Sequence, residues 1–524
     1  MFLKMTSYDE FANAVETAGN TGITLVPVVA ECLSDFITPV SAYRALRENI
    51  SPLSLLESVV QGRQGRYSII AIDPFLRFTV KNGISTEESF DEFATCALMM
   101  YDFPAMSFYS RQRMTAAKTS KKPLEHLNAL LQRYSPMKVP DLDCFTGGAI
   151  GYFGYEAVNL IEPAASKHQI DDLDCPDIYL YFFNKVVIFD HIDKTIKIVV
   201  NVMPSNGVNL INTRNMAIRE IKKIKARLDK GCGESRAYWS RIKPADTEAN
   251  MSREDFISMV KKAKEYIASG DIFQAVLSQR FSREFMPYDV FDFYRLLRHT
   301  NPSPYMFLLE FEEKFSIVGA SPEVMVSIRN GKMLSRPIAG TRKRGQTEKE
   351  DEELARDLST DEKELAEHKM LVDLARNDVG RFAKIGTVNT EGMLRVEYYS
   401  HVMHLASDVT GLLRDDVMPF EACLGSLPAG TLSGAPKIRA MEIINELEPS
   451  CRGPYGGMVG WITEKSLDSC IFIRSALVKN GRIYWQTGAG IVADSIPESE
   501  YEETIIKARA LERVLKLMEK RRRK

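Results

Sequence analysis

Short runs rich in branched and aromatic residues recur along most of the chain and constrain its fold more than any other feature. "RYSIIAID" and "RFTVKNG" are typical of strands, and "NKVVIFDHIDKTIKIVVNV" (184–202) predicts a hairpin around a polar turn. Similar runs return in "DIFQAVLSQRF", "KFSIVGA" and "CIFIRSALV", where they alternate with capped helices. This pattern predicts an α+β fold with large, mainly antiparallel sheets.

The chain has 524 residues, which is too long for one ordinary core and indicates two domains or one intertwined pair. A helix is expected over 215–231, and the polar stretch 232–250 lacks periodicity and is expected to be a linker. A second helix, capped by Ser252, is expected to run from there to Gly270. The expected division is therefore 1–250 and 251–524.

Composition excludes several classes of protein. The formal net charge of −2 gives no reason to expect nucleic acid as a partner, and the basic end "EKRRRK" is short. The N-terminal stretch is not typical of a signal peptide, and we expect no membrane span. Eight scattered cysteines without a CxxC pair favour free thiols in a reducing cytoplasm and give no indication of zinc.

Paired glutamates on an apolar helix face are the first functional signal. The helix expected over 361–380, capped by Asp361, places Glu364 and Glu367 on one stripe with Leu371 and Leu374. A carboxylate that faces a core needs a cation or hydrogen bonds, because an unpaired buried charge is costly. The alternative is the solvated edge of an acidic helix.

A second pair weakens that alternative. In the helix expected after Pro497, Glu500 and Glu503 are again three residues apart, and Glu503 aligns with Ile506 and Ala510. Two helices with paired glutamates can enclose a hard divalent cation. Mg²⁺ takes oxygen ligands and usually binds one or two carboxylates together with an anionic substrate.

Four glycine-bearing stretches accompany the carboxylates: "AGTRKRG", "LPAGTLSGAPK", "RGPYGGMVG" and "QTGAGIVAD". Such turns let backbone N–H groups approach an anion, although each alone could be a structural hairpin. "GTLSGAPK" lacks the GK[ST] ending of a phosphate loop, so ATP is not expected. Arg474, predicted in the interior of the strand "CIFIRSALV", adds a cation that usually has a defined anionic partner. Together these features predict a pocket for a small dicarboxylic substrate.

"PIAGT", "ELAEHKMLVDLARND", "LPAGTLSGAPK", "RGPYGGMVG" and "TGAGIVADSIPESEYEET" resemble motifs of the chorismate-utilising enzymes, in the family's order, over roughly 252–515. The resemblance implies an α+β sandwich of large antiparallel sheets with flanking helices. It makes 251–524 the chorismate-binding catalytic domain and 1–250 an N-terminal domain with an effector-binding segment.

The resemblance also implies roles for individual residues. Mg²⁺ would be held directly by Glu367 and Glu503, and through water by Glu364 and Glu500. The ring carboxylate would be held by the ion with Gly340 and Thr341, and the enolpyruvyl carboxylate by Tyr455, Arg474 and the backbone of Gly488, Ala489 and Gly490. Lys507 would add a cation. His404 matches the active-site histidine, and Glu323, in "GASPEV", matches the general acid, for which a raised pKa is expected. Without the motifs, a core histidine and an ordinary turn carboxylate would be the alternatives.

Two positions bear on which nucleophile attacks the ring. In the water-using branch of the family a lysine activates water, where this chain has Gln274. In the para-aminobenzoate branch a lysine replaces the alanine of "PIAGT", which is Ala339 here. Neither lysine is present, so the resemblance implies the third option, ammonia, which is used by the large subunits of anthranilate synthases.

"SPLSLLESV" (51–59) and "NPSPYMF" (301–307) resemble the tryptophan-binding segments of that branch, although "LLES" could equally be a core strand. The implied effector contacts are Glu57, Ser58, Asn301, Pro304, Tyr305 and Met306. A separate glutaminase partner is implied, because no stretch is left for such a domain. Aminodeoxychorismate synthase and a non-catalytic amino-acid-binding regulator are the alternatives to an ammonia-using anthranilate synthase subunit.

Overall fold

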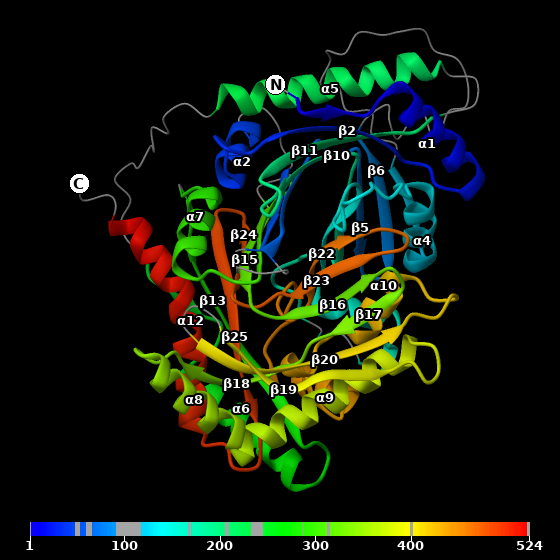
Figure 1. Ribbon diagram of the computed structural model, residues 1–524. Coiled ribbons are helices and arrows are strands. Elements are labelled where there is room, and N and C mark those ends of the chain that lie inside the picture. Colours follow the sequence, from blue (N-terminus) through cyan, green and yellow to red (C-terminus); the bar gives the residue numbers. More distant parts are fainter. Residues whose placement is uncertain are drawn as a thin grey trace.

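The computed structural model describes residues 2–47, 53–58, 65–90, 117–165, 168, 170–204, 209–231, 245–286, 288–311, 315–398 and 402–520 (Figure 1). Two large sheets dominate this part of the chain, and every ladder between named strands is antiparallel. This confirms the predicted α+β class with mainly antiparallel sheets.

The first sheet has 13 strands. In spatial order they are β1 (Lys4–Met5), β2 (Val26–Leu33), β11 (Thr195–Val202), β10 (Lys185–Asp190), β4 (Tyr67–Ile72), β3 (Leu53–Glu57), β14 (Tyr305–Glu310), β15 (Phe315–Ser321), β24 (Ser475–Lys479), β25 (Arg482–Ile491), β13 (Gln274–Glu284) and β12 (Glu248–Ala249), with β21 (Gly434–Ala435) on β13.

The second sheet has 12 strands. Their order is β18 (Ile338–Lys343), β20 (Val402–Leu412), β17 (Lys332–Ser335), β16 (Val324–Arg329), β23 (Leu467–Ile471), β22 (Met458–Ile462), β8 (Gly148–Phe153), β9 (Ile178–Phe183), β5 (Leu76–Lys81), β6 (Ile84–Ser89) and β7 (Ala117–Ser120), with β19 (Asn389–Tyr398) on β20.

Both sheets cross the predicted boundary at residue 250. In the first, Leu55 of β3 pairs with Leu308 of β14, and in the second, Gly151 of β8 pairs with Gly460 of β22. The two parts of the chain are therefore intertwined, as expected, and the division into 1–250 and 251–524 stays a prediction.

Strand β14 shows how the core is built. Phe307 and Leu309 face the apolar layer between the two sheets, whereas Met306 and Leu308 face the opposite side of the first sheet. This alternation follows from the period of two in a strand. The opposite side is covered by α1 (Tyr8–Thr21), α2 (Pro39–Arg47), α5 (Leu210–Lys230), α7 (Val290–Thr300) and α12 (Pro497–Lys520).

The helices that matter for the site are α6 (Arg253–Ala268), α8 (Glu348–Thr360), α9 (Glu362–Phe382), α11 (Lys437–Leu447) and α12. The described residues also form the α-helices α4 (Pro123–Arg133) and α10 (Pro419–Ser426). Asp361 caps α9 by accepting from the backbone N–H groups of Lys363 and Glu364, and Ser252 caps α6, as predicted.

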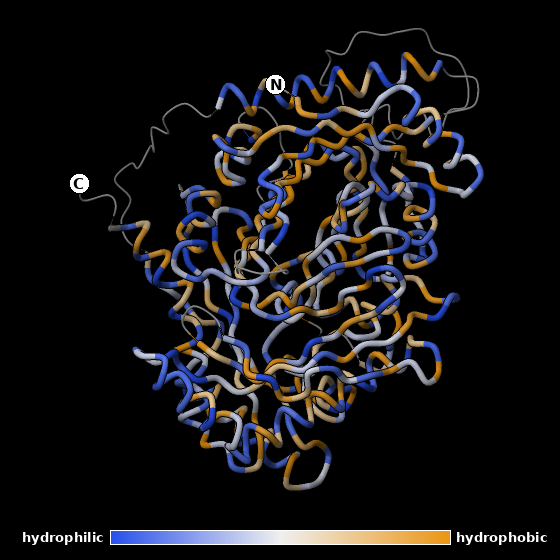
Figure 2. The backbone as a smooth tube through the Cα atoms, viewed as in Figure 1, coloured by the Kyte–Doolittle hydropathy of each residue, from blue (hydrophilic) through white to orange (hydrophobic). Residues whose placement is uncertain are grey.

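Helix α5 begins five residues before the predicted start at residue 215, because Asn209 accepts from the N–H groups of Ile211 and Asn212. Hydrophobic and hydrophilic residues alternate along it at the top of Figure 2, and its buried face packs on the first sheet. Most of the predicted linker, residues 232–244, lies outside the described residues.

One strand prediction is wrong. "CIFIRSALV" is two strands, β23 and β24, which belong to different sheets. Arg474 lies between them with φ of 50°, so the chain turns there instead of continuing as one strand. The predicted hairpin over 184–202 is confirmed as β10 and β11.

The six cysteines within the described ranges form no disulfide bond, and Cys96 and Cys232 lie outside those ranges. In the same ranges, no helix has the length and apolar character that a bilayer span requires.

Candidate active site

A cavity of about 1110 Å³ lies among β13, β18, β25, α9 and α12, and the described residues that line it come from 274–511. We call it the large cavity. It brings together thirteen of the predicted site residues: Gln274, Glu323, Gly340, Thr341, Glu367, His404, Tyr455, Arg474, Gly488, Gly490, Glu500, Glu503 and Lys507. Ala489 does not line it, because its side chain points to the opposite face of β25 and packs with Phe256 and Leu277.

A bulge in β18 carries the predicted ring-carboxylate contacts. The pairing of β18 with β20 shifts register between Ala339 and Arg342, and Gly340 there has φ of 64°. A side chain at position 340 would lie 2.9 Å from Glu364 Oε2, so glycine fits this close approach. The bulge presents the Gly340 carbonyl and the Thr341 hydroxyl to His404.

His404, in β20, is held by this bulge. Its Nδ1 lies 2.8 Å from the Gly340 carbonyl oxygen and 3.1 Å from Thr341 Oγ1. Because a carbonyl oxygen only accepts, Nδ1 carries the proton of the neutral ring and Nε2 is the acceptor nitrogen. Burial lowers the pKa of His404, which favours this neutral form.

Glu323 lies in the short connection between β15 and β16 and is only 9% exposed. Burial raises the pKa of its carboxyl group to about 8, against the lowering effects of the Thr431 hydroxyl and Arg474. Thr431 Oγ1 lies 3.2 Å from Glu323 Oε1. The carboxyl group is therefore protonated at neutral pH, as a general acid requires.

The four glutamates predicted for Mg²⁺ come from α9 and α12. Glu367, Glu500 and Glu503 line the cavity, and Glu364 lies beside Gly340. Burial and the neighbouring carboxylates of Glu364 and Glu503 raise the pKa of Glu367, and burial with Glu503 does the same for Glu500. A divalent cation bound between these carboxylates would reduce their mutual repulsion.

These glutamates are not a preformed metal cage. Nowhere in the described residues do three or more His, Cys, Asp or Glu side chains gather closely enough to hold an ion. Glu364 pairs with Arg342 Nη1 at 3.1 Å, and Glu503 pairs with Lys507 Nζ at 2.7 Å, so two of the four carboxylates bond to cations of the protein. The donor set fits Mg²⁺, which usually takes one or two carboxylates and completes its shell with substrate and water.

Cations and amide groups form another part of the cavity wall, next to the carboxylates. Arg474 is exposed to the cavity, and Tyr455 is 6% exposed with its hydroxyl 3.1 Å from the place that a Cβ at Gly488 would occupy. Lys507 Nζ donates to the Gly488 carbonyl oxygen at 2.9 Å. This wall can bind a carboxylate by charge and hydrogen bonds.

Sequence reasoning missed several residues that line the large cavity. Thr431, Gln486, Lys363 and Asp494 are among them. Thr431 and Gln486 lie within the quoted motifs "LPAGTLSGAPK" and "QTGAGIVAD", so the motifs located them without assigning a contact.

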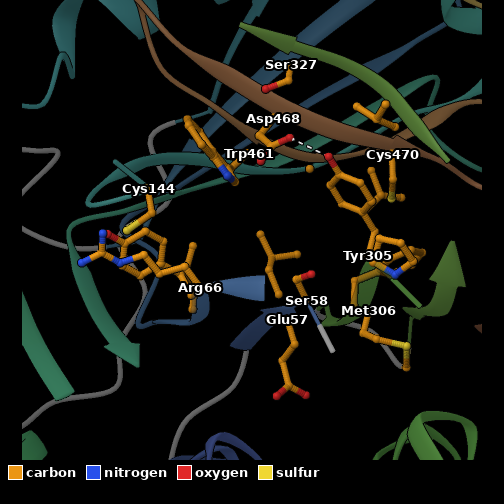
Figure 3. A pocket seen from close by; sticks show the side chains of 18 of the residues that line it. Glu57, Ser58, Arg66, Cys144, Tyr305, Met306, Ser327, Trp461, Asp468 and Cys470 are labelled. Carbon is orange, nitrogen blue, oxygen red and sulfur yellow. Dashed lines mark hydrogen bonds between the residues drawn. The ribbon is translucent and has the colours of Figure 1, made fainter. Parts of the chain in front are cut away.

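A second cavity of about 590 Å³ lies on the other side of Pro322 and Ile338, which line both cavities. Ser58, Pro304, Tyr305 and Met306, predicted as effector contacts, all line it (Figure 3). Ser58 Oγ is buried and has no hydrogen-bond partner among the described residues.

The structure does not bring the other two predicted effector contacts to this cavity in the same way. Glu57 reaches its wall, but its carboxylate points away from Trp461 and Asp468 in Figure 3 and accepts from Tyr294 and from Arg298 Nε, the latter at 3.0 Å. Asn301 lines the large cavity instead. The segment 301–306 therefore runs from one cavity to the other.

Comparison with known proteins places this geometry in a family. Residues 87–513 match the family described as chorismate binding enzyme. The chain is 42% identical to anthranilate synthase component 1 of Acetivibrio thermocellus over 494 residues, 93% of this chain and 94% of the relative. It is 41% identical to the protein of that name from Aquifex aeolicus over 499 residues, 94% of this chain and 95% of the relative.

Solved structures agree. Anthranilate synthase component I from Streptococcus pneumoniae superposes with a TM-score of 0.70 at 33% identity, covering 92% of this chain and 98% of that one. The menaquinone-specific isochorismate synthase from Escherichia coli shares the fold at 18% identity, with a TM-score of 0.66 and coverage of 96% and 99%. The chain belongs to the chorismate-binding enzymes, among the anthranilate synthase component 1 proteins.

Proposed function

We propose that the chain forms anthranilate and pyruvate from chorismate and ammonia in the large cavity. The observation that carries the proposal is the combination of a buried, protonated acid, a cationic wall and paired carboxylates around one space, with no amine at position 274 or 339. The likeness to anthranilate synthase component 1 proteins over most of the chain supports it.

Binding of the dianionic substrate would use both walls. Arg474, Tyr455 and the backbone near Gly488 would hold the enolpyruvyl carboxylate, and Gly340 with Thr341 would orient the ring carboxylate. The neutral His404 ring, fixed through Nδ1, presents Nε2 as an acceptor near the ring. The walls would thereby hold C2 open to a small nucleophile.

Glu323 would protonate the departing C4 hydroxyl. As the ammonia nitrogen bonds to C2, the ring double bonds shift and the C4–O bond breaks, and the proton from Glu323 makes the leaving group water. Loss of the C2 proton and cleavage of the C3–O bond then release pyruvate and aromatise the ring. The sum is chorismate and ammonia giving anthranilate, pyruvate and water.

Glu367 and Glu503 would hold Mg²⁺ directly, with Glu364 and Glu500 in support. When bound, the ion would supply positive charge that binds the ring carboxylate and offsets charge that develops during the reaction. The mutual repulsion of these carboxylates in the structure supports this assignment.

Three further properties belong to the proposal. A separate glutaminase subunit would supply ammonia in the cytoplasm. Tryptophan would bind the second cavity, where Ser58 Oγ could accept from its ammonium group and Pro304, Tyr305 and Met306 could line the indole. The cavity is adjacent to the large one, which supports a role as an inhibitory site.

Incubation of the purified chain with chorismate, MgCl₂ and ammonium sulfate tests the proposal, with anthranilate fluorescence as the measurement. We expect anthranilate without any partner protein. Accumulation of 4-amino-4-deoxychorismate would instead favour an aminodeoxychorismate synthase, and unreacted chorismate with intact tryptophan binding would favour a non-catalytic regulator.

A further inference from the structure

A buried ion pair lies behind the wall of the large cavity. Arg452 is 2% exposed and Glu448, at the end of α11, is 4% exposed. The guanidinium binds the carboxylate with two hydrogen bonds, Nη2 to Oε1 at 2.6 Å and Nε to Oε2 at 2.9 Å. Neither residue lines the cavity, so neither would touch a bound substrate.

Arg452 uses its other donors on two segments of the cavity wall. Nη1 donates to the Leu432 carbonyl oxygen at 2.6 Å, and Nη2 donates to the Val276 carbonyl oxygen at 2.7 Å. Leu432 follows Thr431, which bonds to Glu323, and Val276 is a lining residue of β13. The planar fork of an arginine can satisfy a carboxylate and two carbonyls together, which a lysine ammonium cannot reproduce.

The same guanidinium packs on aromatic rings. The guanidinium carbon, Cζ of Arg452, lies 4.6 Å from the ring centre of Tyr155 and 5.6 Å from that of Tyr455. Tyr455 belongs to the proposed carboxylate-binding wall. Cation–π attraction at these distances therefore helps to orient a ring that faces the substrate.

Glu448 connects β13 with one further strand, β25. Its Oε1 accepts from the Ser278 N–H at 2.8 Å and from Ser278 Oγ at 2.7 Å. Because an ionised carboxylate only accepts, Ser278 Oγ donates its hydrogen to Glu448. It must therefore accept from Gln486 Nε2, which lies 2.8 Å away. The ion pair thus sets the direction of a hydrogen-bond chain that ends at Gln486 on the cavity wall.

We propose that the Arg452–Glu448 pair is a positioning unit for the reaction, which fixes Thr431, Tyr455, Val276 and Gln486 around the large cavity. This inference rests on the proposed function, since its purpose is to hold the acid and the carboxylate-binding wall in register. Displacement of such groups by about 1 Å can cost a hundredfold in rate.

The test compares Arg452→Lys with Arg283→Lys. Arg283 is a matched control, because it is a buried arginine, in β13, that is paired with Glu519 and does not line the large cavity. The measurements are the melting temperature, kcat and KM for chorismate with ammonium salt, and the pH dependence of kcat/KM.

For Arg452→Lys we expect kcat/KM to fall about thirtyfold, mainly through kcat. We also expect the alkaline limb of the kcat/KM–pH profile to move to higher pH. The Thr431 hydrogen bond lowers the pKa of Glu323, and the variant would weaken that bond. Arg283→Lys should lose melting temperature without either change. Equal losses of activity in the two variants, with the alkaline limb of each pH profile unchanged from the wild type, would overturn the inference.

Ser278→Ala keeps the inference testable if Arg452→Lys does not fold, because it cuts the chain between Glu448 and Gln486 without unpairing a charge. We expect normal folding with kcat/KM reduced about fivefold, and wild-type kinetics in this variant would overturn the inference. A wild-type chain that forms no anthranilate would overturn the proposed function itself, and the inference with it.

Discussion

The two cavities differ in which parts of the chain build them and in how their charges are paired. Among the described residues, those that line the large cavity all come after 273, whereas those that line the second cavity come from both sides of residue 250 and from both sheets. In the second cavity, Arg66 pairs with Asp190, Arg329 with Asp468 and Arg336 with Asp408. In the large cavity, the Glu367 and Glu500 carboxylates repel their neighbours and Arg474 is exposed.

This difference indicates which kind of ligand each cavity can bind. The large cavity presents carboxylates and an exposed arginine that a cation and a dianion would pair with, as the proposed chemistry on a dicarboxylic substrate requires. The second cavity presents paired charges, apolar walls and the buried Ser58 hydroxyl, which has no hydrogen-bond partner among the described residues. Such a site suits a mainly apolar ligand with one polar end, and its position across the two halves suits regulation.

The largest effect is expected where the large cavity is most strongly charged. Glu503→Gln should lower kcat/KM about ten-thousandfold, because a metal ion contributes several kcal/mol to stabilising charge and each 1.4 kcal/mol is about tenfold. Chelation of Mg²⁺ should lower the wild-type activity similarly. Glu502→Gln, one residue away on α12 and outside the cavity, is the matched control and should be active. Full activity of Glu503→Gln in chelator would contradict the metal assignment.

Glu323 should give the next largest effect and a defined pH dependence. Because the pKa of its carboxyl group is raised to about 8, the acid form is present below that pH and is lost as pH rises through it. We expect kcat/KM to fall on this alkaline limb, and Glu323→Gln to lose about a thousandfold without the limb. The raised pKa also makes folding progressively less favourable as pH rises from 4.5 to about 8, so above that window this variant should unfold less readily than the wild type. A Glu323→Gln variant that keeps the limb would assign the titration to another group.

Ala339→Lys asks whether the empty space beside the ring selects the nucleophile. The side chain is 8% exposed and lies next to the bulge, so a lysine would occupy space that ammonia needs. We expect anthranilate formation to fall about a hundredfold, with a covalent adduct of the chorismate ring visible by mass spectrometry on the peptide that contains residue 339. Ala339→Met, of similar length without an amine, should lose rate and form no adduct. A folded Ala339→Lys enzyme with the wild-type rate would show that this position does not select the nucleophile.

The smallest effect is expected in the second cavity. Ser58→Ala should weaken tryptophan inhibition about tenfold and leave uninhibited turnover unchanged, since allosteric couplings are typically about 1–3 kcal/mol. Ser327→Ala removes a hydroxyl from another wall of the same cavity and should change inhibition less. Wild-type activity that is insensitive to millimolar tryptophan would contradict the proposed role of this cavity.

Local features of the fold could be predicted from the sequence because short-range chemistry determines them. Asp361 and Ser252 cap helices as expected, and the hairpin over 184–202 forms between two branched runs. The pairing of β3 with β14 could not be predicted in the same way, because it joins residues about 250 positions apart and no local pattern encodes it.

In the candidate site, too, local features could be predicted from the sequence and long-range contacts could not. Helical spacing placed Glu367 and Glu503 on faces that do meet at one cavity. Spacing could not show that Arg474 lies at a turn between two sheets, because apolar residues on both sides continue the strand pattern through it. It also could not show that Glu57, in β3, bonds to Tyr294 and Arg298, since those partners come from α7, far along the chain.

The most direct test of the central claim is the identity of the product formed with ¹⁵N-labelled ammonium, chorismate and Mg²⁺, followed by mass spectrometry and NMR. The account predicts one labelled nitrogen on the ring carbon next to the carboxyl-bearing carbon of anthranilate, with one pyruvate released per label. A product labelled at C4 of the ring, or a C2-hydroxylated product without label, would contradict it.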